Sequence, residues 1–258
     1  MKWCKWVLAL GTCMVLGSTQ TQAQIWVGPK VGMQTSRFFF ADPDAAEVYN
    51  ERWWLGWQAG WVANYDVSSH WSLATDYAYS RKSRSHTAVF DNEVIKFYRA
   101  TYGFLDASAL LRYSIGEMPR HYYFNVGPVV SLWTDGRGRI RTGFTDRAEY
   151  LRGYTYGLAF KRENQEQFEE MYVQDANRFQ VGIEVGIGAQ FDILYDKRLQ
   201  IDLRYQMGHT HLAKEESGDF GLPGIVFTDN FEGVLHTFSI SASILSAFDF
   251  IEPKTRGY

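Results

Sequence analysis

The chain has little cysteine and proline, and long apolar runs are missing after its first segment. Of its 258 residues, two are cysteine and six are proline. Both cysteines, Cys4 and Cys13, lie near the N-terminus, so the remaining chain can form no disulfide framework and offers no thiolate chemistry. No later apolar run is long enough to cross a membrane as a helix. These absences exclude a disulfide-stapled scaffold and a helical membrane protein.

Residues 1–23 have the pattern of a secretory signal peptide. Lys2 and Lys5 give a positive start, an apolar stretch covers residues 7–16, and Ala23 ends a small-residue cleavage site. A lipoprotein acylated at Cys13 is the alternative, but the residues before Cys13 fit that pattern poorly. We therefore expect cleavage after Ala23.

The charge balance is mildly acidic. The chain has 26 basic and 29 acidic residues, a net charge of −3. Removing residues 1–23 takes away two lysines and no acidic residue, so 24 basic residues would face 29 acidic ones, a net charge of −5. This balance gives no general reason to expect nucleic acid as a partner.

Residues 178–195 alternate between apolar and polar or glycine positions without a break from Phe179 onward. Side chains on a strand point to opposite faces with period 2, so one face is apolar and the other carries Glu184, Gln190 and Asp192. The run exceeds the usual length of soluble strands and suits a tilted membrane-spanning strand. A long strand of a soluble sandwich or lipocalin-like barrel is the alternative.

The same alternation recurs in about eight segments, at residues 25–35, 53–66, 71–80, 101–115, 121–133, 178–195, 199–209 and 233–248. The connections between them alternate between long and short, as in outer-membrane barrels with short periplasmic turns and long extracellular loops. A soluble barrel would carry its charge outward, whereas here one face is apolar in every strand. We predict an all-β fold, an eight-stranded antiparallel transmembrane β-barrel with long extracellular loops and short periplasmic turns, in the outer membrane of a Gram-negative cell. The barrel domain would cover residues 24–250 and a C-terminal tail residues 251–258.

Aromatic residues fringe the apolar face. Trp53, Trp54 and Trp57 lie near the loop end of one strand, and Tyr65 and Trp71 flank its turn end. Amphipathic rings favour both membrane interfaces, although an ordinary aromatic core would also use them.

Three segments resemble the PorT-like outer-membrane β-barrel proteins of Bacteroidetes: Leu105–Tyr113, Tyr123–Leu132 with its Gly-Pro pair, and Leu199–Gly208 with its Arg-Tyr pair. Ile25–Met33 is similar to the first strand of that family. Ala107-Ser108-Ala109 departs from it, because the family commonly has Ile-Pro there. The resemblance implies the barrel fold and, through the member that gives the family its name, a link to type IX protein secretion. It implies no catalytic residues.

The polar face of the strands carries charged residues that would point into the barrel. An eight-stranded barrel is filled by its own side chains, and buried charges must be paired. We expect a structural charge network in the lumen, with a proton or ion path as the alternative; its members would be Lys30, Asp76, Asp106, Arg112, Glu184, Asp192, Asp202 and Arg204.

Two basic stretches fall in predicted loops, Arg81–Arg84 and a second that contains Arg137, Arg139 and Arg141. Arginine pairs well with phosphate, so extracellular arginines would meet lipopolysaccharide. A solvated charged loop is the simpler interpretation, which we favour, and contact with lipopolysaccharide phosphates is the alternative.

Other candidate sites are weaker. His209 and His211 have the spacing of two ligands on one strand face, but a metal needs a further ligand such as Glu215 or Glu216. A lipid-modifying enzyme would need a Ser-His-acid site, and only His209, His211, His236 and Ser239 are available near strand ends. Residues 163–172 have the pattern of an amphipathic helix. We predict no metal and no cofactor.

We therefore expect a non-enzymatic outer-membrane barrel that helps protein secretion or envelope assembly. Outer-membrane lipid, lipopolysaccharide and other envelope or secretion-system proteins would be its partners. A structural or adhesive barrel that binds ligands through its loops is the first alternative, and a lipid-modifying enzyme is the second.

Overall fold

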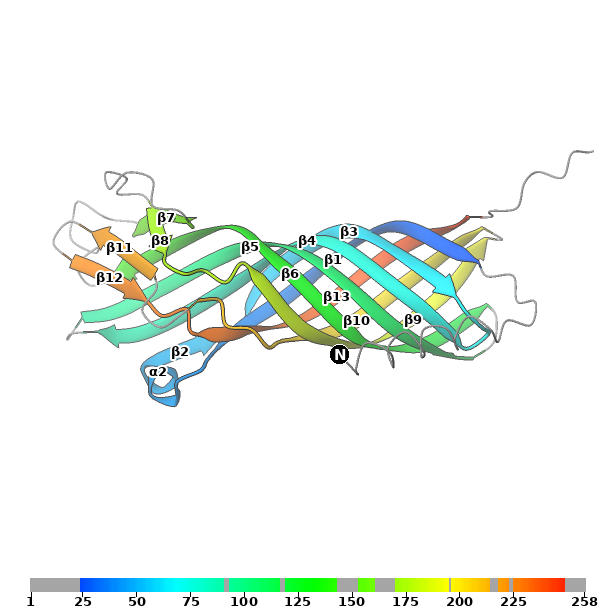
Figure 1. Ribbon diagram of the computed structural model, residues 1–258, viewed down its shortest axis with the longest axis horizontal. Coiled ribbons are helices and arrows are strands. Elements are labelled where there is room, and N and C mark those ends of the chain that lie inside the picture. The colour runs from blue at the N-terminus through cyan, green and yellow to red at the C-terminus, as the bar shows by residue number, and fades with distance from the viewer. Residues whose placement is uncertain are drawn as a thin grey trace, which may run out of the picture.

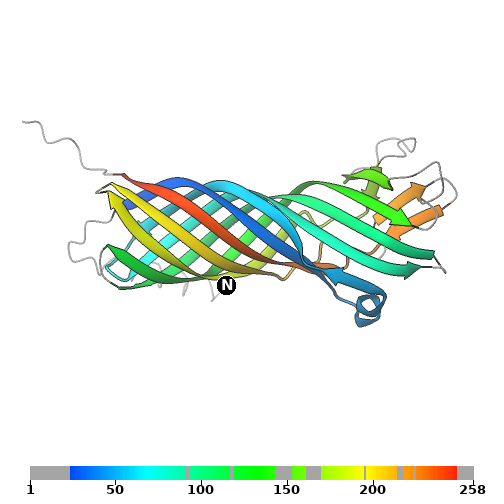
Figure 2. The same ribbon diagram turned by 180° about the vertical axis from the view of Figure 1, so that it is seen from behind.

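Eight strands close into one antiparallel barrel (Figures 1 and 2). The structure, a computed structural model, describes residues 24–90, 93–116, 119–142, 153–160, 170–194, 196–213, 218–222 and 225–248. Each barrel strand pairs with the next, and β13 pairs back with β1. This ring confirms the predicted fold; its strands are β1 (Ile25–Phe40), β3 (Trp54–Asp66), β4 (Trp71–Phe90), β5 (Glu93–Ile115), β6 (Arg120–Thr142), β9 (Phe179–Leu194), β10 (Lys197–Gly208) and β13 (Gly233–Phe248).

The two ends of the barrel differ. Short connections join β3 to β4, β5 to β6 and β9 to β10 at the end where Ile25 of β1 pairs with Phe248 of β13. Longer segments leave the opposite end between β1 and β3, β6 and β9, and β10 and β13. In outer-membrane barrels the short turns are periplasmic and the longer connections extracellular. The signal peptide predicted at residues 1–23 and the tail predicted at 251–258 lie outside the described residues.

A second part of the sheet continues beyond the extracellular end, where β4, β5 and β6 extend past the other barrel strands (Figure 1). β7 pairs with β6, β8 with β7, β11 with β8 and β12 with β11, while β2 pairs with β4. We call this region the extracellular sheet. Its added elements are α2 (Pro43–Val48), β2 (Tyr49–Arg52), β7 (Tyr154–Ala159), β8 (Glu170–Val173), β11 (Gly218–Leu222) and β12 (Ile225–Asp229).

The prediction of a charged loop at residues 81–96 is wrong. β4 and β5 continue through this region as paired strands, with Lys82 opposite Tyr102 and Phe90 opposite Glu93. The charges that suggested a solvated loop instead point inward, where Lys82 and Arg84 are buried. A barrel with a polar interior places charge on the inner face of its strands, so charge in this chain does not mark loops.

Three other predicted connections also contain regular structure. Residues 36–52 hold the end of β1, α2 and β2, and residues 134–177 hold the end of β6, β7 and β8. Residues 210–232 hold β11 and β12. The helix predicted at residues 163–172 is wrong at its end, because residues 170–172 belong to β8 and pair with β7 and β11. Its first part, residues 163–169, lies outside the described residues.

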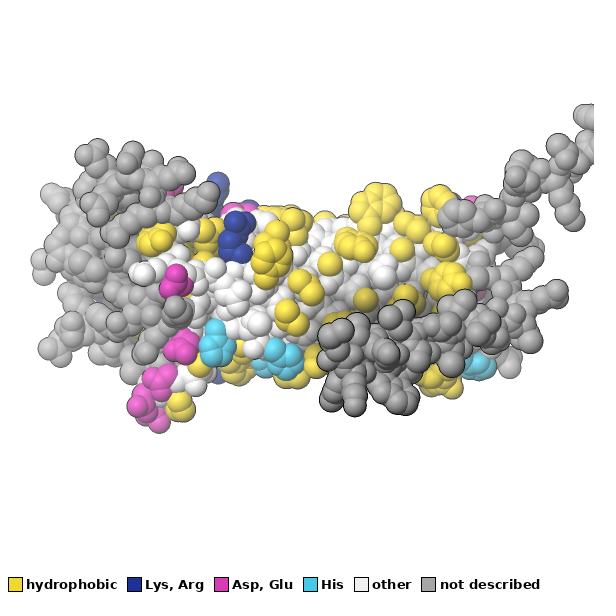
Figure 3. Space-filling view, viewed as in Figure 1, with side chains coloured by type: hydrophobic (Ala, Val, Ile, Leu, Met, Phe, Trp, Pro, Cys, Tyr) yellow, Lys and Arg dark blue, Asp and Glu magenta, His cyan; other side chains and the backbone are white. Residues whose placement is uncertain are grey.

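The outer wall of the barrel is apolar, which inverts the usual arrangement of a soluble protein (Figure 3). Large hydrophobic side chains such as Trp61, Leu111, Ile187 and Leu203 are exposed around the wall. Only a lipid environment makes such a wall favourable, because its apolar area stays out of water. We call this wall the apolar belt. Within the described residues no helix is long and apolar enough to cross a membrane.

Aromatic rings border the belt at both ends. Trp71 packs on Tyr113 at the periplasmic end, with 4.8 Å between ring centroids. Trp53 packs on Phe238 at the extracellular end at 5.3 Å. Trp54, in contrast, is half-buried and lies under the guanidinium of Arg99. The belt therefore has the two aromatic girdles typical of membrane barrels.

Arginine in place of Leu203 tests the apolar belt. Leu203 is 51% exposed in the middle of β10, so the charged side chain would enter the bilayer core. We expect the free energy of unfolding to fall by about 2–4 kcal/mol. Urea-induced unfolding in lipid vesicles measures this, and Leu203→Ala controls for the lost leucine. Equal losses in the two variants would contradict the placement of this wall in lipid.

Candidate functional site

The interior of the barrel is the most highly charged buried region of the described chain. Inside the belt, four cations, Lys30, Lys82, Arg112 and Arg204, face four carboxylates. All eight residues predicted for the lumen point inward, and Lys82 joins them. The carboxylates of this central group are those of Asp76, Asp106, Glu184 and Asp202.

Arg204 is the hub of this interior network. Its guanidinium contacts Asp202 on its own strand at 3.1 Å and Glu184 on β9 at 2.8 Å. It also forms an ion pair with Asp76 on β4. Because β4 and β10 lie opposite one another in the ring, this one side chain links the two walls across the lumen.

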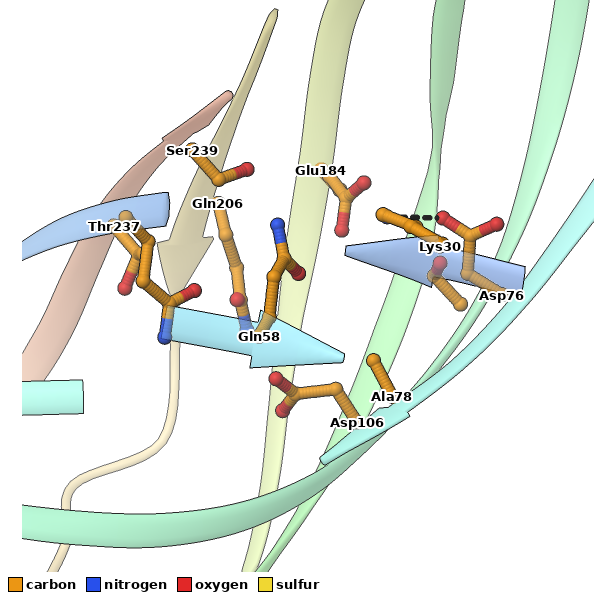
Figure 4. Close-up of a pocket in the computed structure, with 11 residues that line it drawn as sticks. Lys30, Gln58, Asp76, Ala78, Asp106, Glu184, Gln206, Thr237 and Ser239 are labelled. Atoms are coloured by element: carbon orange, nitrogen blue, oxygen red, sulfur yellow. Dashed lines mark hydrogen bonds and ion pairs between the residues drawn. The ribbon is translucent and has the colours of Figure 1, made fainter. Parts of the chain in front are cut away.

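Two lysines complete the pairing on either side of Arg204. Lys30 Nζ lies 2.7 Å from Asp76 (Figure 4). Lys82 Nζ lies 3.0 Å from Asp106. Gln206 accepts a hydrogen bond from Lys82 at 3.0 Å. The cavity between these groups has a volume of about 20 Å³, room for roughly one water molecule. The lumen at this level is therefore filled.

Arg112 closes the interior nearer the periplasmic end. Its guanidinium lies 3.8 Å from the centroid of the Tyr123 ring and donates to Asn125 at 3.0 Å. Asn125 in turn donates to Asp202 at 3.2 Å, and Arg112 lies 4.0 Å from the same carboxylate. The Tyr123 ring fits only because residue 188 is glycine, where an added Cβ would lie 2.4 Å from a ring carbon.

Asp192 stands apart from the central network. It pairs with Arg198 at 3.0 Å near the periplasmic turns, and Arg198 also reaches Asp66 at 2.8 Å. The Arg198 guanidinium stacks 3.6 Å from the centroid of the Trp26 ring. The predicted set of eight thus divides into a central network and one residue of a separate periplasmic group.

A second buried charge cluster fills the extracellular mouth, above the apolar belt. Arg84 is fully buried and pairs with Glu51 of β2 at 2.7 Å and with Asp229 at 3.2 Å. Tyr98 donates a hydrogen bond to Asp229, and its ring stacks on His86 at 4.1 Å. We call these five residues the mouth cluster. It ties β2, β4, β5 and the end of β12 together.

The mouth cluster keeps its charges through pairing. Burial disfavours a charged Arg84, but Asp229 and Glu51 outweigh this effect and hold its pKa well above the usual range. Burial lowers the pKa of His86 below its ordinary value, although Glu51 lies 3.3 Å from Nδ1. His86 is therefore neutral at pH 7 while Arg84 is charged.

Aromatic and aliphatic side chains pack around the mouth cluster. Tyr102, Trp133 and Phe231 are buried and in contact, with 5.3 Å between the Tyr102 and Trp133 rings. Phe38 lies 4.2 Å from the Arg84 guanidinium. This apolar core caps the lumen on the extracellular side, so the interior offers no wide water-filled passage through the described residues.

The sequence prediction missed the mouth cluster. Glu51, Arg84 and Asp229 are far apart along the chain, and none falls in a segment predicted as strand. The signal that could have found Arg84 is the alternation itself, which continues from Asp76 through Ala78, Ser80 and Lys82 on the inner face.

The two basic stretches differ in where their side chains point. In Arg81–Arg84, Lys82 and Arg84 point inward and Arg81 pairs with Asp135 at 2.6 Å, so the prediction that this stretch meets lipopolysaccharide from a loop is wrong. Arg137, Arg139 and Arg141 are exposed on the outer face of β6 rather than in a loop.

The histidines do not assemble into the arrangements considered for them. The Tyr205 hydroxyl bonds His236 Nδ1 on the outer face, while Ser239 lines the interior. His211 lies 3.8 Å from Glu232. The described residues contain no group of histidine, cysteine and carboxylate side chains arranged to hold a metal, and Glu215 and Glu216 lie outside them.

Removing the hub of the lumen network tests its role. Arg204→Met leaves Asp76, Glu184 and Asp202 facing one another with too few cations, and we expect a loss of about 3–5 kcal/mol in unfolding free energy. Lys197→Met makes the same charge change at the exposed rim, where about 0–1 kcal/mol is expected. Urea titrations in vesicles compare the two. Similar losses would show that the network is not what holds the interior.

Acidification tests the buried neutral histidine. Since the folded pKa of His86 lies below the unfolded value, the unfolded chain binds more protons below pH 6.5, and stability falls as the pH drops. The contribution reaches up to about 1.4 kcal/mol per pH unit. We expect His86→Asn to flatten the dependence between pH 7 and 5. An identical pH profile for wild type and His86→Asn would contradict this.

Comparisons with known proteins give one family match and several solved structures of low sequence identity. The family model "Outer membrane protein beta-barrel domain" matches residues 20–214. Solved structures with similarity include Neisserial surface protein A (12% identity, 87% of this chain and 97% of that chain, TM-score 0.39). OprG from Pseudomonas aeruginosa (9%, 88% and 96%, TM-score 0.48) and Ail of Yersinia pestis (11%, 86% and 98%, TM-score 0.37) are others.

The sequence matches no curated protein. The family match covers well over half of the chain. It fits the lipid-facing belt, the closed ring of strands, and the short turns at one end with longer connections at the other. The chain therefore belongs to the outer membrane protein beta-barrel domain family and resides in the outer membrane.

Proposed function

We propose that this protein is a non-enzymatic, non-conducting barrel that presents its extracellular sheet as a docking surface. The observation that carries the proposal is the continuation of β4, β5 and β6 beyond the apolar belt, capped by the mouth cluster and its aromatic core. A barrel that served only as an anchor would need none of this ordered structure outside the membrane. The filled lumen supports a role outside the barrel rather than through it.

The partner of the extracellular sheet would be another protein of the cell envelope. The resemblance to PorT-like proteins supports an accessory role in protein secretion or envelope assembly, with other envelope proteins as partners. An adhesive or structural barrel is the alternative, in which the same sheet binds ligands from outside the cell. A lipid-modifying enzyme is less well supported, because His236 and Ser239 lie on opposite faces of β13.

Site-specific photo-crosslinking in cells tests the docking surface. A crosslinking residue at Arg141 or Lys96 in the extracellular sheet should capture macromolecular partners, because both side chains are exposed there. Leu203 in the belt is the matched control, where only lipid contact is expected. Capture at Arg141 no greater than at Leu203 would contradict the proposal. Capture concentrated at Arg120, on the periplasmic rim, would place the partners on the other side of the membrane.

Comparing the surface and medium proteomes with and without the gene then separates the two kinds of partner. Loss of many secreted proteins from the medium, with accumulation in the periplasm, is expected for the secretion role. An unchanged secretome with altered surface binding is expected for the adhesive role.

A further inference from the structure

A bulge in β6 turns a row of arginines to the outside of the barrel. The register between β5 and β6 shifts at Gly103 and Phe104, where Thr134 is the extra residue. Below the bulge Ser131 and Trp133 point inward, and above it Arg137 points outward. Without the bulge the alternation would direct Arg137, Arg139 and Arg141 into the lumen.

An arginine of the neighbouring strand β5 lies beside this row. Arg99 of β5 and Arg139 of β6 are directly opposite in the antiparallel register, and like charges in that arrangement are destabilising. Arg99 lies above the belt, where burial and the charge of Arg139 lower its pKa. The outer faces of the two strands thus bring two guanidinium groups close together above the apolar belt.

Arg99 is also held in a fixed position. Its guanidinium stacks 3.7 Å from the centroid of the Trp54 ring, and its Nε is buried without a hydrogen-bond partner among the described residues. The acidic residue of the bulge, Asp135, is already engaged by Arg81 at 2.6 Å and by Thr134 at 2.9 Å. The positive charge of Arg99 is thus not neutralised by Asp135.

The arginines lie at the level of lipid headgroups. Leu105 and Leu132 lie on the outer wall of the same two strands just below the bulge, as part of the apolar belt. A ligand here would therefore carry its charge beside the arginines and its apolar part beside the leucines.

We propose that Arg99, Arg137 and Arg139 bind a phosphate of the phosphorylated glycolipid in the outer leaflet of the membrane. Guanidinium groups bind phosphate through two parallel hydrogen bonds, and the stacked Trp54 ring presents Arg99 in one orientation. The lipid's acyl chains would cover Leu105 and Leu132 below. This site rests on the outer-membrane placement and is independent of the docking surface proposed above.

Binding of diphosphorylated lipid A to the full-length protein in detergent micelles tests the site, with enzymatically dephosphorylated lipid A as the comparison probe. Wild type should prefer the phosphorylated lipid, and Arg99→Gln/Arg137→Gln should weaken its binding about tenfold. Arg120→Gln removes one exposed arginine at the periplasmic rim, and it should leave the affinity unchanged. The single variant Arg137→Gln changes only an exposed side chain, so it serves as the test if the double variant does not fold.

A second readout separates lipid binding from a structural role of the arginines. Added lipid A should raise the melting temperature of wild type more than that of Arg99→Gln. Equal binding of the two lipid A forms by wild type would overturn the proposal. An equal loss of affinity in Arg120→Gln would also overturn it, because the effect would then be one of general charge.

Discussion

The structure depends on ion pairs that neutralise the charges inside the barrel. The barrel is too narrow to hold enough water to solvate these charges. Eight strands leave an interior that side chains fill, and a buried charge without a partner is very costly. Arg204 meets this constraint by contacting Asp76, Glu184 and Asp202 from three strands. Each of the other central cations, Lys30, Lys82 and Arg112, has a carboxylate of its own or shares one. The pairing fixes the distance between opposite walls and occupies the space a solute would need.

The same constraint explains why the extracellular sheet is ordered. Above the apolar belt the inner faces of β4 and β5 continue to carry polar side chains, so Arg84 needs partners there too. It finds them in Glu51 and Asp229, which come from β2 and from the end of β12. The buried ion pairs therefore anchor segments that would otherwise be loops. Aromatic rings such as Phe38 and Phe231 cover the guanidinium and exclude water from the cluster.

The sequence predicts the barrel well because alternation is a local property. The alternation at residues 233–248 has the same bounds as β13, and the inward side of Asp76, Arg112 and Arg204 follows from the parity of their strands. The alternation cannot say which charges meet, because Arg204 and Asp76 are distant in sequence and come together only when the ring closes. Nor does it reveal a bulge, which changes parity through a single extra residue, Thr134.

The errors share one physical cause. A prediction that takes charge as a mark of solvated loops fails here, because Lys82 and Arg84 are buried inside the barrel. In a barrel surrounded by lipid, charged residues at every second position indicate a strand, just as leucines at every second position do. This also explains why the strands are longer than predicted at the extracellular end, where apolar outward residues give way to arginine.

Paired charges and the aromatic core fill the lumen from the periplasmic turns to the extracellular mouth. Single-channel recording of the purified protein in planar lipid bilayers tests this filling. We expect no conductance steps of nanosiemens size at any moderate voltage. Regular steps of that size from the folded protein would contradict it, because they would require a continuous water-filled passage where Arg204, Arg112 and Arg84 now bridge the walls.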